Sequence, residues 1–313
     1  MRSFILLSFI IFTFSCRSDS GDTKNKAHFR PYVFDNIMIQ KDVIYGTEDT
    51  TQQVMDIYLH GQRVGEPKWM EIDTSLHKTL IYIHGGGWLG GDKSDNIFQF
   101  VPFLEEGFNL FSLNYRMGVG TAPDAAEDVI CALRWIVDGA DQYQLDTENI
   151  YITGGSAGGH LALVSGFAPT SDDTYQCDVS DIRIRGIINQ FGITEIEKTE
   201  KFLSTYKPDW NYPSAWIGDM ERMGKISQKY SPVYMVNENV PPVITIHGSV
   251  DSVVPYAQSH LLENVLKEKG VYHKLVTIEG GNHGGFGDKG WDLMMKESFD
   301  FINSIEKGSI HSN

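Results

Sequence analysis

The chain has 313 residues, an ordinary length for one α/β enzyme domain, and its 41% apolar and 12% aromatic content can form a substantial core. Its formal charge of −15 argues against nucleic-acid binding and against electrostatic docking to anionic lipid, because no basic stripe offsets phosphate repulsion. Neutral or weakly charged ligands remain compatible with this charge. No CxxC or clustered His/Cys spacing predicts a metal site.

The N-terminus has the features of an export signal. Arg2 precedes a mainly apolar run from Phe4 to Phe14, which is too short to span a bilayer and is followed by Ser15 and Cys16. We predict a signal peptide over residues 1–15, and Cys16 resembles the lipidated first residue of a bacterial lipoprotein. The alternatives are cleavage without a lipid and an apolar N-terminus with no targeting role.

The rest of the chain is predicted to form one domain, since it contains no internal repeat and no long low-complexity linker. A hydrophilic tether is expected at 16–30, the folded domain at 31–306 and a short tail at 307–313. Along the domain, alternating segments at 37–46 and 52–61 are predicted to pair as strands.

The elements that follow alternate between strands and helices, which predicts a mostly parallel sheet flanked by helices. In chain order we expect a loop at 62–77, a strand at 78–87, a helix at 96–106, a strand at 108–115, a helix at 123–137, a strand, sharp turn and helix over 148–166, strands at 183–192 and 241–248, a helix at 256–269, a strand at 272–280 and a helix at 291–305.

Residues 195–230 break this alternation and are rich in aromatic side chains and proline. We predict that this insertion forms a cap over an active site, and the alternative is an ordinary surface excursion whose aromatic side chains pack down. Trp210 and Trp216 of the insertion are candidates for substrate contact. Trp88 is a third candidate, although it could equally anchor its own loop.

The segment GGSAGG places Ser156 directly after the apolar strand NIYIT. A serine hydroxyl is a poor nucleophile unless a base lies within hydrogen-bond reach and the hydroxyl is exposed. A tight strand-to-helix turn would expose it, and Gly154 and Gly158 leave room for such a turn. The sequence therefore predicts Ser156 as the nucleophile, and a flexible glycine-serine turn is the alternative.

The segment HGGGW at 84–88 follows a second apolar strand. Acyl transfer passes through a tetrahedral oxyanion, which preorganised backbone N–H groups stabilise best. We expect Gly86 and Gly87 to supply such donors together with Ala157, whose amide lies at the start of a helix. His84 is expected to hold the loop in place and not to react.

A general base and its partner are expected near the C-terminus, because loops at strand ends carry catalytic groups. His283 lies in the glycine-rich loop GGNHGG, and Asp251 follows the strand PPVITIHG by a short loop. Asp251 would hold the imidazole of His283 in its useful tautomer. The alternatives are a helix-capping role for Asp251 and a plain surface position for His283.

Other residues of the same types are weaker candidates. His160 is expected to pack on the helix after Ser156, and His247 to orient its loop. Three acidic residues precede the nucleophile on a helix that has the character of a solvated face, namely Asp124, Glu127 and Asp128. Cys131 and Cys177 could form a disulfide in an exported protein, but Cys131 also fits the position of a small core residue.

Five segments carry a resemblance to a known family, namely HGGGW, NYR at 114–116, GGSAGG, HGSVDSVVP and GGNHGGF. Over residues 43–305 the chain resembles an α/β-hydrolase of the esterase/lipase group that carries HGGG. It is similar to small carboxylesterases and to the feruloyl and acetylxylan esterase type. The resemblance implies a triad of Ser156, Asp251 and His283 that needs no cofactor.

The expected function is that of an exported serine ester hydrolase that acts through an acyl-enzyme, as an acetyl or feruloyl carbohydrate deacylase. Its partners would be small-molecule or oligosaccharide esters, with a membrane reached only through a lipid on Cys16. An amidase, formamidase or peptidase would use the same triad, and a non-catalytic binding module of the same fold is a further alternative.

Overall fold

The computed structural model describes residues 35–48, 51–64 and 69–309. The expected signal peptide, Cys16 and the tether at 16–30 lie outside these residues. Within the described ranges, none of the helices combines the length and the apolar character that a membrane crossing requires.

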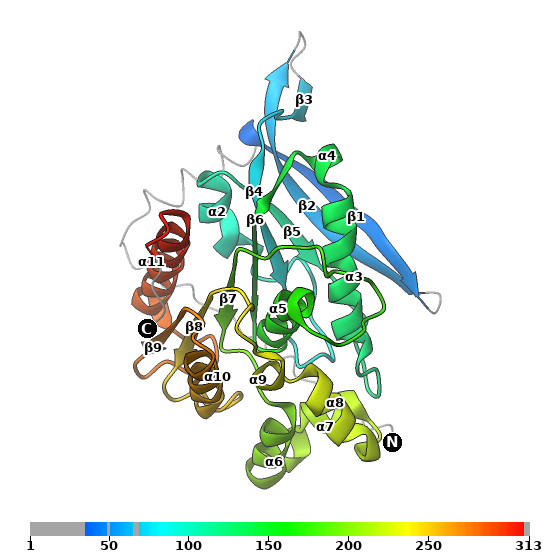
Figure 1. Cartoon of the computed structure of the whole chain (residues 1–313), viewed down its shortest axis with the longest axis vertical. Coiled ribbons are helices and arrows are strands. Elements are labelled where there is room, and N and C mark those ends of the chain that lie inside the picture. The colour runs from blue at the N-terminus through cyan, green and yellow to red at the C-terminus, as the bar shows by residue number, and fades with distance from the viewer. Residues whose placement is uncertain (1–34, 49–50, 65–68, 310–313) are drawn as a thin grey trace, which may run out of the picture.

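A nine-stranded sheet forms the centre of the molecule (Figure 1). The strand order is β1-β2-β5-β4-β6-β7-β8-β9, with β3 beside β2. Strand β2 is antiparallel to β1, β3 and β5, and every other pair is parallel. The strands are β1 (Ile37–Glu48), β2 (Thr51–Val64), β3 (Trp69–Ile72), β4 (His77–Ile83), β5 (Phe108–Leu113), β6 (Leu145–Gly155), β7 (Gly186–Gln190), β8 (Val243–Gly248) and β9 (His273–Ile278). This is the α/β-hydrolase arrangement that the sequence predicted.

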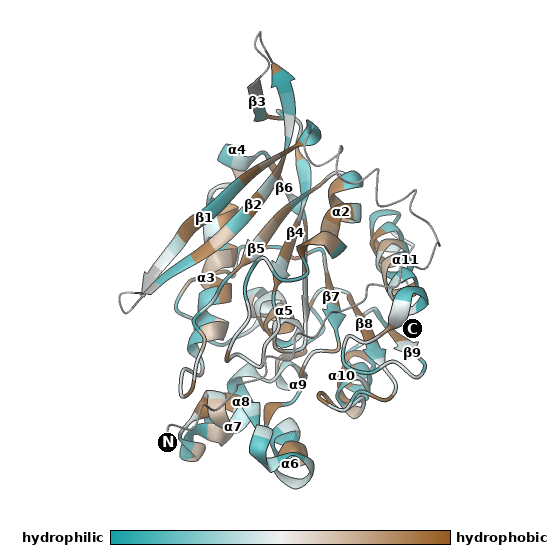
Figure 2. Ribbon diagram, turned by 180° about the vertical axis from the view of Figure 1, so that it is seen from behind, coloured by the Kyte–Doolittle hydropathy of each residue, from teal (hydrophilic) through white to brown (hydrophobic). Residues whose placement is uncertain are grey.

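The interior strands are buried along most of their length because helices cover both faces of the sheet. All residues of β5, β7 and β8 are buried, which explains why their sequences read as apolar runs with little alternation. Figure 2 shows brown, hydrophobic segments along the central strands, whereas the flanking helices carry both brown and teal residues.

The helices are η1 (Ile97–Phe100), α2 (Val101–Glu105), α3 (Asp124–Asp138), α4 (Ala140–Tyr143), α5 (Ala157–Phe167), η2 (Ala168–Thr170), α6 (Ile196–Tyr206), η3 (Pro208–Trp210), α7 (Tyr212–Ile217), η4 (Met220–Arg222), α8 (Met223–Tyr230), α9 (Pro232–Met235), α10 (Ala257–Glu268) and α11 (Gly287–Glu306). Helices α3, α5 and α10 pack into the core on one face of the sheet, whereas α2 and α11 pack on the other face.

Several predicted elements differ from the observed ones; the strand predicted at 78–87, for example, ends at Ile83. Residues 62–77 are not a loop throughout, because β2 extends to Val64 and β3 pairs with its end. The helix predicted at 96–106 is split into η1 and α2, with Pro102, which has no N–H to donate, in the first turn of α2. The last helix begins at Gly287, four residues before the predicted start.

The insertion predicted at 195–230 lies between β7 and β8 and folds as the helices from α6 to α8. These helices lie beyond the end of the sheet to which β4 and β7 point, so they stand near the carboxyl ends of the parallel strands (Figure 1). In folds of this kind, ligands bind at that edge of the sheet.

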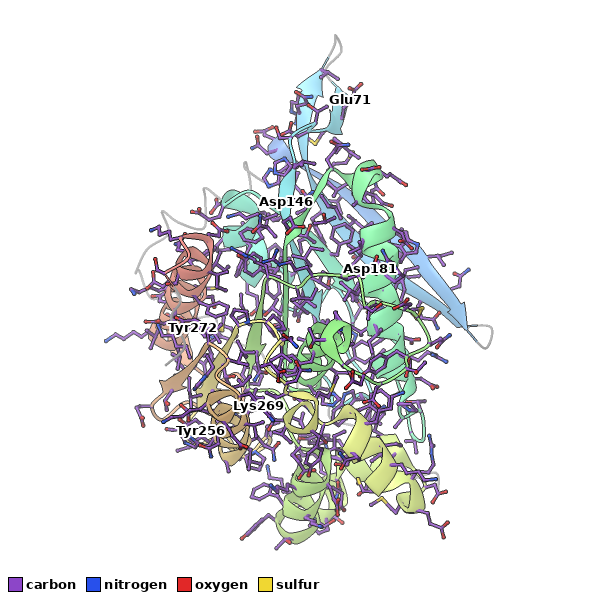
Figure 3. The ribbon with its side chains drawn as sticks, in the orientation of Figure 1. Glu71, Asp146, Asp181, Tyr256, Lys269 and Tyr272 are labelled. Carbon is purple, nitrogen blue, oxygen red and sulfur yellow. A yellow bond between two sulfur atoms is a disulfide. The ribbon has the colours of Figure 1, made fainter. Side chains whose placement is uncertain are left out.

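A disulfide joins Cys131 of α3 to Cys177, which the sequence left undecided. Arg134, one helical turn further along α3, donates to Asp181 at 2.6 Å. Asp181 is labelled in Figure 3. The segment between η2 and β7 is therefore attached to α3 by a covalent bond and by an ion pair.

Candidate active site

Ser156 lies at the sharp turn between β6 and α5. Its backbone has φ 58° and ψ −123°, a strained conformation for a residue that is not glycine. A Cβ atom on Gly154 would lie 2.4 Å from the carbonyl oxygen of Gly158, and a Cβ on Gly158 would lie 2.1 Å from that of Ile83. The two glycines are therefore required for this turn, as the motif predicted, and the turn brings Ser156 to the wall of a pocket.

The HGGGW loop forms the facing wall of the pocket. Gly86 has φ +115°, and a Cβ on it would lie 1.9 Å from the carbonyl oxygen of Gly90. Gly87 has φ +63°, and a Cβ on it would lie 3.1 Å from the Cβ of Tyr212 of α7. Both glycines line the pocket beside Ser156, whereas Ala157, whose amide begins α5, is fully buried. The structure thus brings the three expected oxyanion donors to the neighbourhood of the serine.

His84 belongs to the support of this loop. Its ring is buried, stacks on Tyr115 at 4.5 Å between centroids, and places Nδ1 2.7 Å from the carbonyl oxygen of Gly85. The Tyr115 hydroxyl donates to the carbonyl oxygen of His84 at 3.0 Å. Burial lowers the pKa of His84, which favours a neutral ring. These contacts agree with the supporting role expected for His84.

The NYR segment anchors the far end of the same loop. Asn114 accepts the backbone N–H of Lys93 at 2.6 Å and donates to Asp92 at 3.0 Å. Arg116 forms a bidentate ion pair with Asp128 of α3, with Nη2 donating to Oδ1 at 2.7 Å and Nε donating to Oδ2 at 3.0 Å. Asp128 is buried, so its expected position on a solvated helix face is wrong, because the carboxylate is held by Arg116.

Asp251 and His283 come together although 32 residues separate them. His283 Nδ1 lies 2.8 Å from Oδ2 of Asp251, whose side chain is fully buried. The other carboxylate oxygen of Asp251 accepts the N–H groups of Val253 at 2.8 Å and Val254 at 3.0 Å. The loop after β8 therefore fixes the carboxylate, and the carboxylate fixes the ring of His283.

Oδ2 of Asp251 has a second histidine partner, His247, which the sequence predicted only to orient its loop. His247 Nε2 lies 3.1 Å from Asp251 Oδ2 and 3.1 Å from the carbonyl oxygen of Val254. Both of these oxygens accept, so this nitrogen donates, while Nδ1 faces the hydroxyl of Ser259 at 2.6 Å. The four-residue spacing in HGSVD was the available signal for this contact.

The electrostatics of Asp251 follow from these contacts. Burial alone would raise its pKa, but the hydrogen bonds from His247 and His283 hold the pKa of Asp251 well below its usual range. The carboxylate consequently stays ionised beside His283, which suits the stabilisation of an imidazolium.

Phe191 is another residue that the sequence interpretation did not select. It has φ 42°, and its ring meets that of His283 edge to face at a centroid distance of 4.8 Å. Phe191 also lines the pocket. It therefore supports one side of the His283 ring at the cost of backbone strain.

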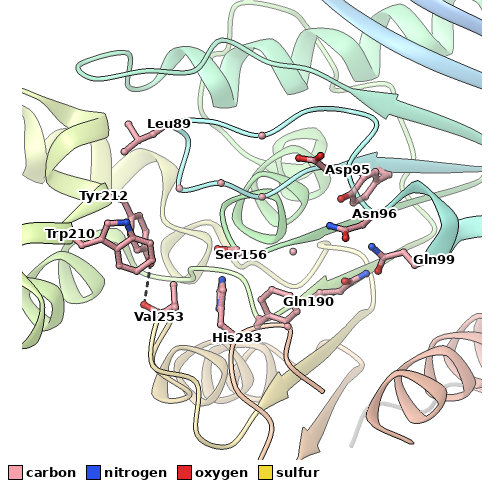
Figure 4. Close-up of a pocket in the computed structure, with 18 of the residues that line it drawn as sticks. Leu89, Asp95, Asn96, Gln99, Ser156, Gln190, Trp210, Tyr212, Val253 and His283 are labelled. Carbon is pink, nitrogen blue, oxygen red and sulfur yellow. Dashed lines mark hydrogen bonds between the residues drawn. The ribbon is translucent and has the colours of Figure 1, made fainter. Parts of the chain in front are cut away.

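A cavity of about 550 Å³ joins these groups. Ser156, His283 and the glycines of the HGGGW loop line it, as do Trp210 and Tyr212 of the insertion. In Figure 4 the side chains of Ser156 and His283 point toward one another. The arrangement provides a hydroxyl, an imidazole held by a buried carboxylate, and a glycine-rich wall around one space.

The three tryptophans selected as substrate contacts have different positions. Trp210 lines the pocket and is 51% exposed. Trp88 and Trp216 are fully buried and stack on each other with centroids 4.3 Å apart. The expectation that Trp216 binds substrate is therefore corrected, and for Trp88 the structure favours the alternative of a loop anchor, because the two rings fix the HGGGW loop to α7.

His160 lies in the same buried aromatic cluster. Its Nε2 donates to the carbonyl oxygen of Tyr230 at 2.7 Å, and burial lowers its pKa to about 4. It packs on α5 as expected and holds the end of α8. Across the described part of the chain, no group of three or more His, Cys, Asp or Glu residues is placed to bind a metal ion.

One protein-family model and several known proteins are similar to this chain. Residues 67–266 match the model of the BD-FAE family. The esterase LipC of Mycobacterium tuberculosis is 25% identical over 225 residues, which span 70% of this chain but 53% of LipC. The chain thus spans about half the length of this curated relative.

Two solved structures are similar over most of the chain. A truncated form of a carbohydrate esterase from gut microbiota has a TM-score of 0.68 and 23% identity, and the match covers 86% of this chain and 97% of that one. A bifunctional GH43-CE protein of Bacteroides eggerthii has a TM-score of 0.68 and 27% identity, and the match covers 85% of this chain and 38% of that one.

Proposed function

Because the chain belongs to the BD-FAE family, we propose that it is a serine-type carboxylic ester hydrolase that removes acetyl or feruloyl groups from carbohydrates. One observation carries the proposal. Ser156, on a strained turn, and His283, bonded to the buried carboxylate of Asp251, line one pocket beside the glycines of HGGGW.

The mechanism follows from the roles of these groups. His283 uses Nδ1 for Asp251, which leaves Nε2 to take the proton of the Ser156 hydroxyl as this oxygen attacks the ester carbonyl. The amides of Gly86, Gly87 and Ala157 stabilise the oxyanion. The protonated His283 then gives its proton to the leaving alcohol.

Water completes the cycle by the same steps. His283 takes a proton from water, the resulting hydroxide attacks the acyl-enzyme, and the carboxylic acid leaves as Ser156 regains its proton. Asp251 stays ionised throughout and stabilises the imidazolium form of His283.

The carbohydrate part of the proposal has two supports. Similar structures are named as a carbohydrate esterase and as a bifunctional GH43-CE protein. The pocket itself is lined by the neutral amide side chains of Asn96, Gln99 and Gln190, which suit a sugar ester better than a long aliphatic chain.

The test is a substrate panel of acetylated xylo-oligosaccharides, methyl ferulate and short aryl esters, measured for the wild type and for Ser156→Ala. We expect wild-type activity on at least one carbohydrate ester and a loss in the variant of about 10⁴-fold or more. Activity on aryl esters alone would contradict the carbohydrate assignment, and an active Ser156→Ala would contradict the mechanism.

Two further measurements separate the rival functions. A matched ester and amide distinguish an esterase from an amidase, formamidase or peptidase, since faster amide hydrolysis would favour the rivals. Labelling of Ser156 by a fluorophosphonate distinguishes an enzyme from a non-catalytic module, because only an activated serine reacts.

We also propose that the protein is exported and anchored by a lipid on Cys16, so that it faces the periplasm or the cell surface. The apolar run before Cys16 supports it, and so does the disulfide between Cys131 and Cys177, since disulfides persist in oxidising compartments. Cys16→Ser is expected to move the protein from the membrane fraction to the soluble fraction. An unchanged distribution would argue against a lipid on this residue.

A further inference from the structure

We propose that the pocket consists of two chemically different subsites on either side of Ser156, a polar one for the hydroxyls of an uncharged sugar alcohol and an apolar one for the acyl group. This inference rests on the proposed function and adds the residues that would select the substrate. Figure 4 shows Asp95, Asn96, Gln99 and Gln190 on one side of Ser156, and Leu89, Trp210, Tyr212 and Val253 on the other.

The apolar subsite is built from aliphatic and aromatic side chains. The rings of Trp210 and Tyr212 meet edge to face at a centroid distance of 5.4 Å. Tyr212 is buried, and its hydroxyl points to the carbonyl oxygen of Val253 at 3.4 Å. Its polar atom thus has a partner within the protein, and ring surface is left for the acyl group.

The polar subsite differs because its side chains are only partly engaged by the protein. Among the hydrogen bonds of the described residues, none reaches Oε1 of Gln99, although this atom is buried. Gln190 is buried and donates its Nε2 to Thr153 at 3.2 Å. Both glutamines line the pocket, and a rotation of the Gln99 amide toward the cavity would give its unpaired oxygen a hydroxyl donor from the ligand.

Asn96 lines the pocket with its backbone in the left-handed conformation. It has φ 57° at the start of η1, and its side chain makes no capping bond to that helix. Its side chain hydrogen-bonds Tyr82, which also lines the pocket, and burial raises the pKa of Tyr82 to about 12. A neutral phenol and an amide offer both donors and acceptors, as a polyol requires.

The charge of the polar subsite narrows the choice of sugar. Asp95 accepts the N–H of Asp92 at 2.9 Å, which fixes a carboxylate at the pocket edge. No lysine or arginine occurs among the described residues that line the pocket. A uronate would face this negative charge without a cation to pair with it, so the subsite favours neutral sugars.

The test compares a sugar ester with an aryl ester in matched variants. Gln99→Leu keeps the side-chain volume and removes its polar atoms, and Asn96→Gly removes the side chain while tolerating φ 57°. For each variant, kcat/KM for an acetylated xyloside is expected to fall roughly three- to tenfold more than kcat/KM for 4-nitrophenyl acetate. The control, Asn303→Ala on the exposed side of α11, is expected to leave both rates unchanged.

A third variant tests the charge. Asp95→Asn keeps an acceptor for the N–H of Asp92 and removes the negative charge. It is expected to raise the ratio of activity on an acetylated glucuronoside to that on the acetylated xyloside by about threefold or more.

The outcomes separate the inference from the proposed function. If the wild type cleaves the xyloside ester but Gln99→Leu and Asn96→Gly slow both substrates equally or not at all, the two-subsite inference is overturned and the esterase proposal stands. If the wild type cleaves aryl acetate but no sugar ester, the carbohydrate assignment and the inference fail together.

Discussion

The Nδ1 atom of His283 lies 2.8 Å from Oδ2 of Asp251, across a gap of 32 residues in the chain. The carboxylate has no exposed surface, and its other oxygen is held by two backbone N–H groups. Because both partners are fixed, the ring of His283 keeps one orientation and one protonated nitrogen toward Asp251. The nitrogen that faces the pocket is then free to act as a base.

Asp251→Asn is expected to lower kcat by roughly 10³- to 10⁴-fold while the protein stays folded. An amide cannot accept from both histidines and the loop amides in the same way, so His283 loses the tautomer that presents a basic nitrogen to Ser156. Turnover of an aryl acetate measures the fall in kcat, and the circular dichroism spectrum shows whether the variant stays folded. A rate within tenfold of the wild type would remove Asp251 from the mechanism.

Asp251 also predicts a dependence of stability on pH. Its pKa in the folded protein lies below the value of about 3.9 that it has when unfolded, so its stabilising contribution is complete above pH 4 and is lost as the pH falls below that value. Urea unfolding at a series of pH values between about 5 and 2.5 should therefore show a shallower fall in the free energy of unfolding for Asp251→Asn than for the wild type. If the free energy of unfolding fell equally steeply in both proteins, the pKa of Asp251 would not be lowered in the folded state.

His247 is expected to act through Asp251, as a positioning residue. His247→Phe removes one donor from the carboxylate and leaves the buried hydroxyl of Ser259 unpaired, which should cost about 1–3 kcal/mol of stability. His247→Gln can still donate to Asp251 and should retain more of the rate. We expect kcat to fall about tenfold in His247→Phe with KM nearly unchanged, because His247 does not line the pocket.

A purely structural role for His247 would give a different pattern. Both variants would then lose stability without a difference in kcat between the folded fractions, as thermal unfolding and active-site titration together would reveal.

The fold and the central residues of the site could be predicted because their signals are local. Apolar runs followed by glycines marked β4 and β6, and the glycines around Ser156 were needed for the turn that the structure contains. The pair of Asp251 and His283 was predicted from the order of the motifs along the chain, and the structure brings the two residues together. Their catalytic roles stay a prediction until the variants are measured.

The parts that were wrong depend on the direction of a side chain. Nothing in HGGGW or in the aromatic insertion indicates that Trp88 and Trp216 face each other and not the pocket. Asp128 fitted a solvated helix face by spacing, but its partner Arg116 lies on a different element. His247 was predicted to orient its loop, and its bond to the carbonyl oxygen of Val254 agrees with that, but its bond to Asp251 was not predicted although the spacing in HGSVD allowed it.

The disulfide between Cys131 and Cys177 is expected to stabilise the fold without taking part in catalysis. The bond closes a loop with a sequence separation of 46, for which chain-entropy arguments give up to about 4 kcal/mol. Cys131→Ala with Cys177→Ala should lower the free energy of unfolding by about 2–4 kcal/mol and leave kcat within twofold in the folded protein. Treatment of the wild type with a reductant should reproduce the shift, and a reductant effect of equal size in the double variant would show that the bond is not its cause.

The turn at Ser156 gives the most specific structural prediction. It compares Gly158 of α5 with Gly224 of α8, two helical glycines that differ in their surroundings. A Cβ on Gly158 would lie 2.1 Å from the carbonyl oxygen of Ile83 and 2.6 Å from that of His84, and neither backbone oxygen can move without shifting β4 or the HGGGW loop. Gly158→Ala should therefore displace Ser156 and lower kcat/KM by about 10²-fold or more.

Gly224 of α8 is the matched control, since a Cβ there meets nothing within 4 Å. Gly224→Ala should leave kcat/KM unchanged and raise the free energy of unfolding by up to about 1 kcal/mol, because alanine is the better helix former. If Gly158→Ala behaved like this control, α5 would be free to move away from β4. The tight approach of strand and helix would then not be what sets the position of the serine.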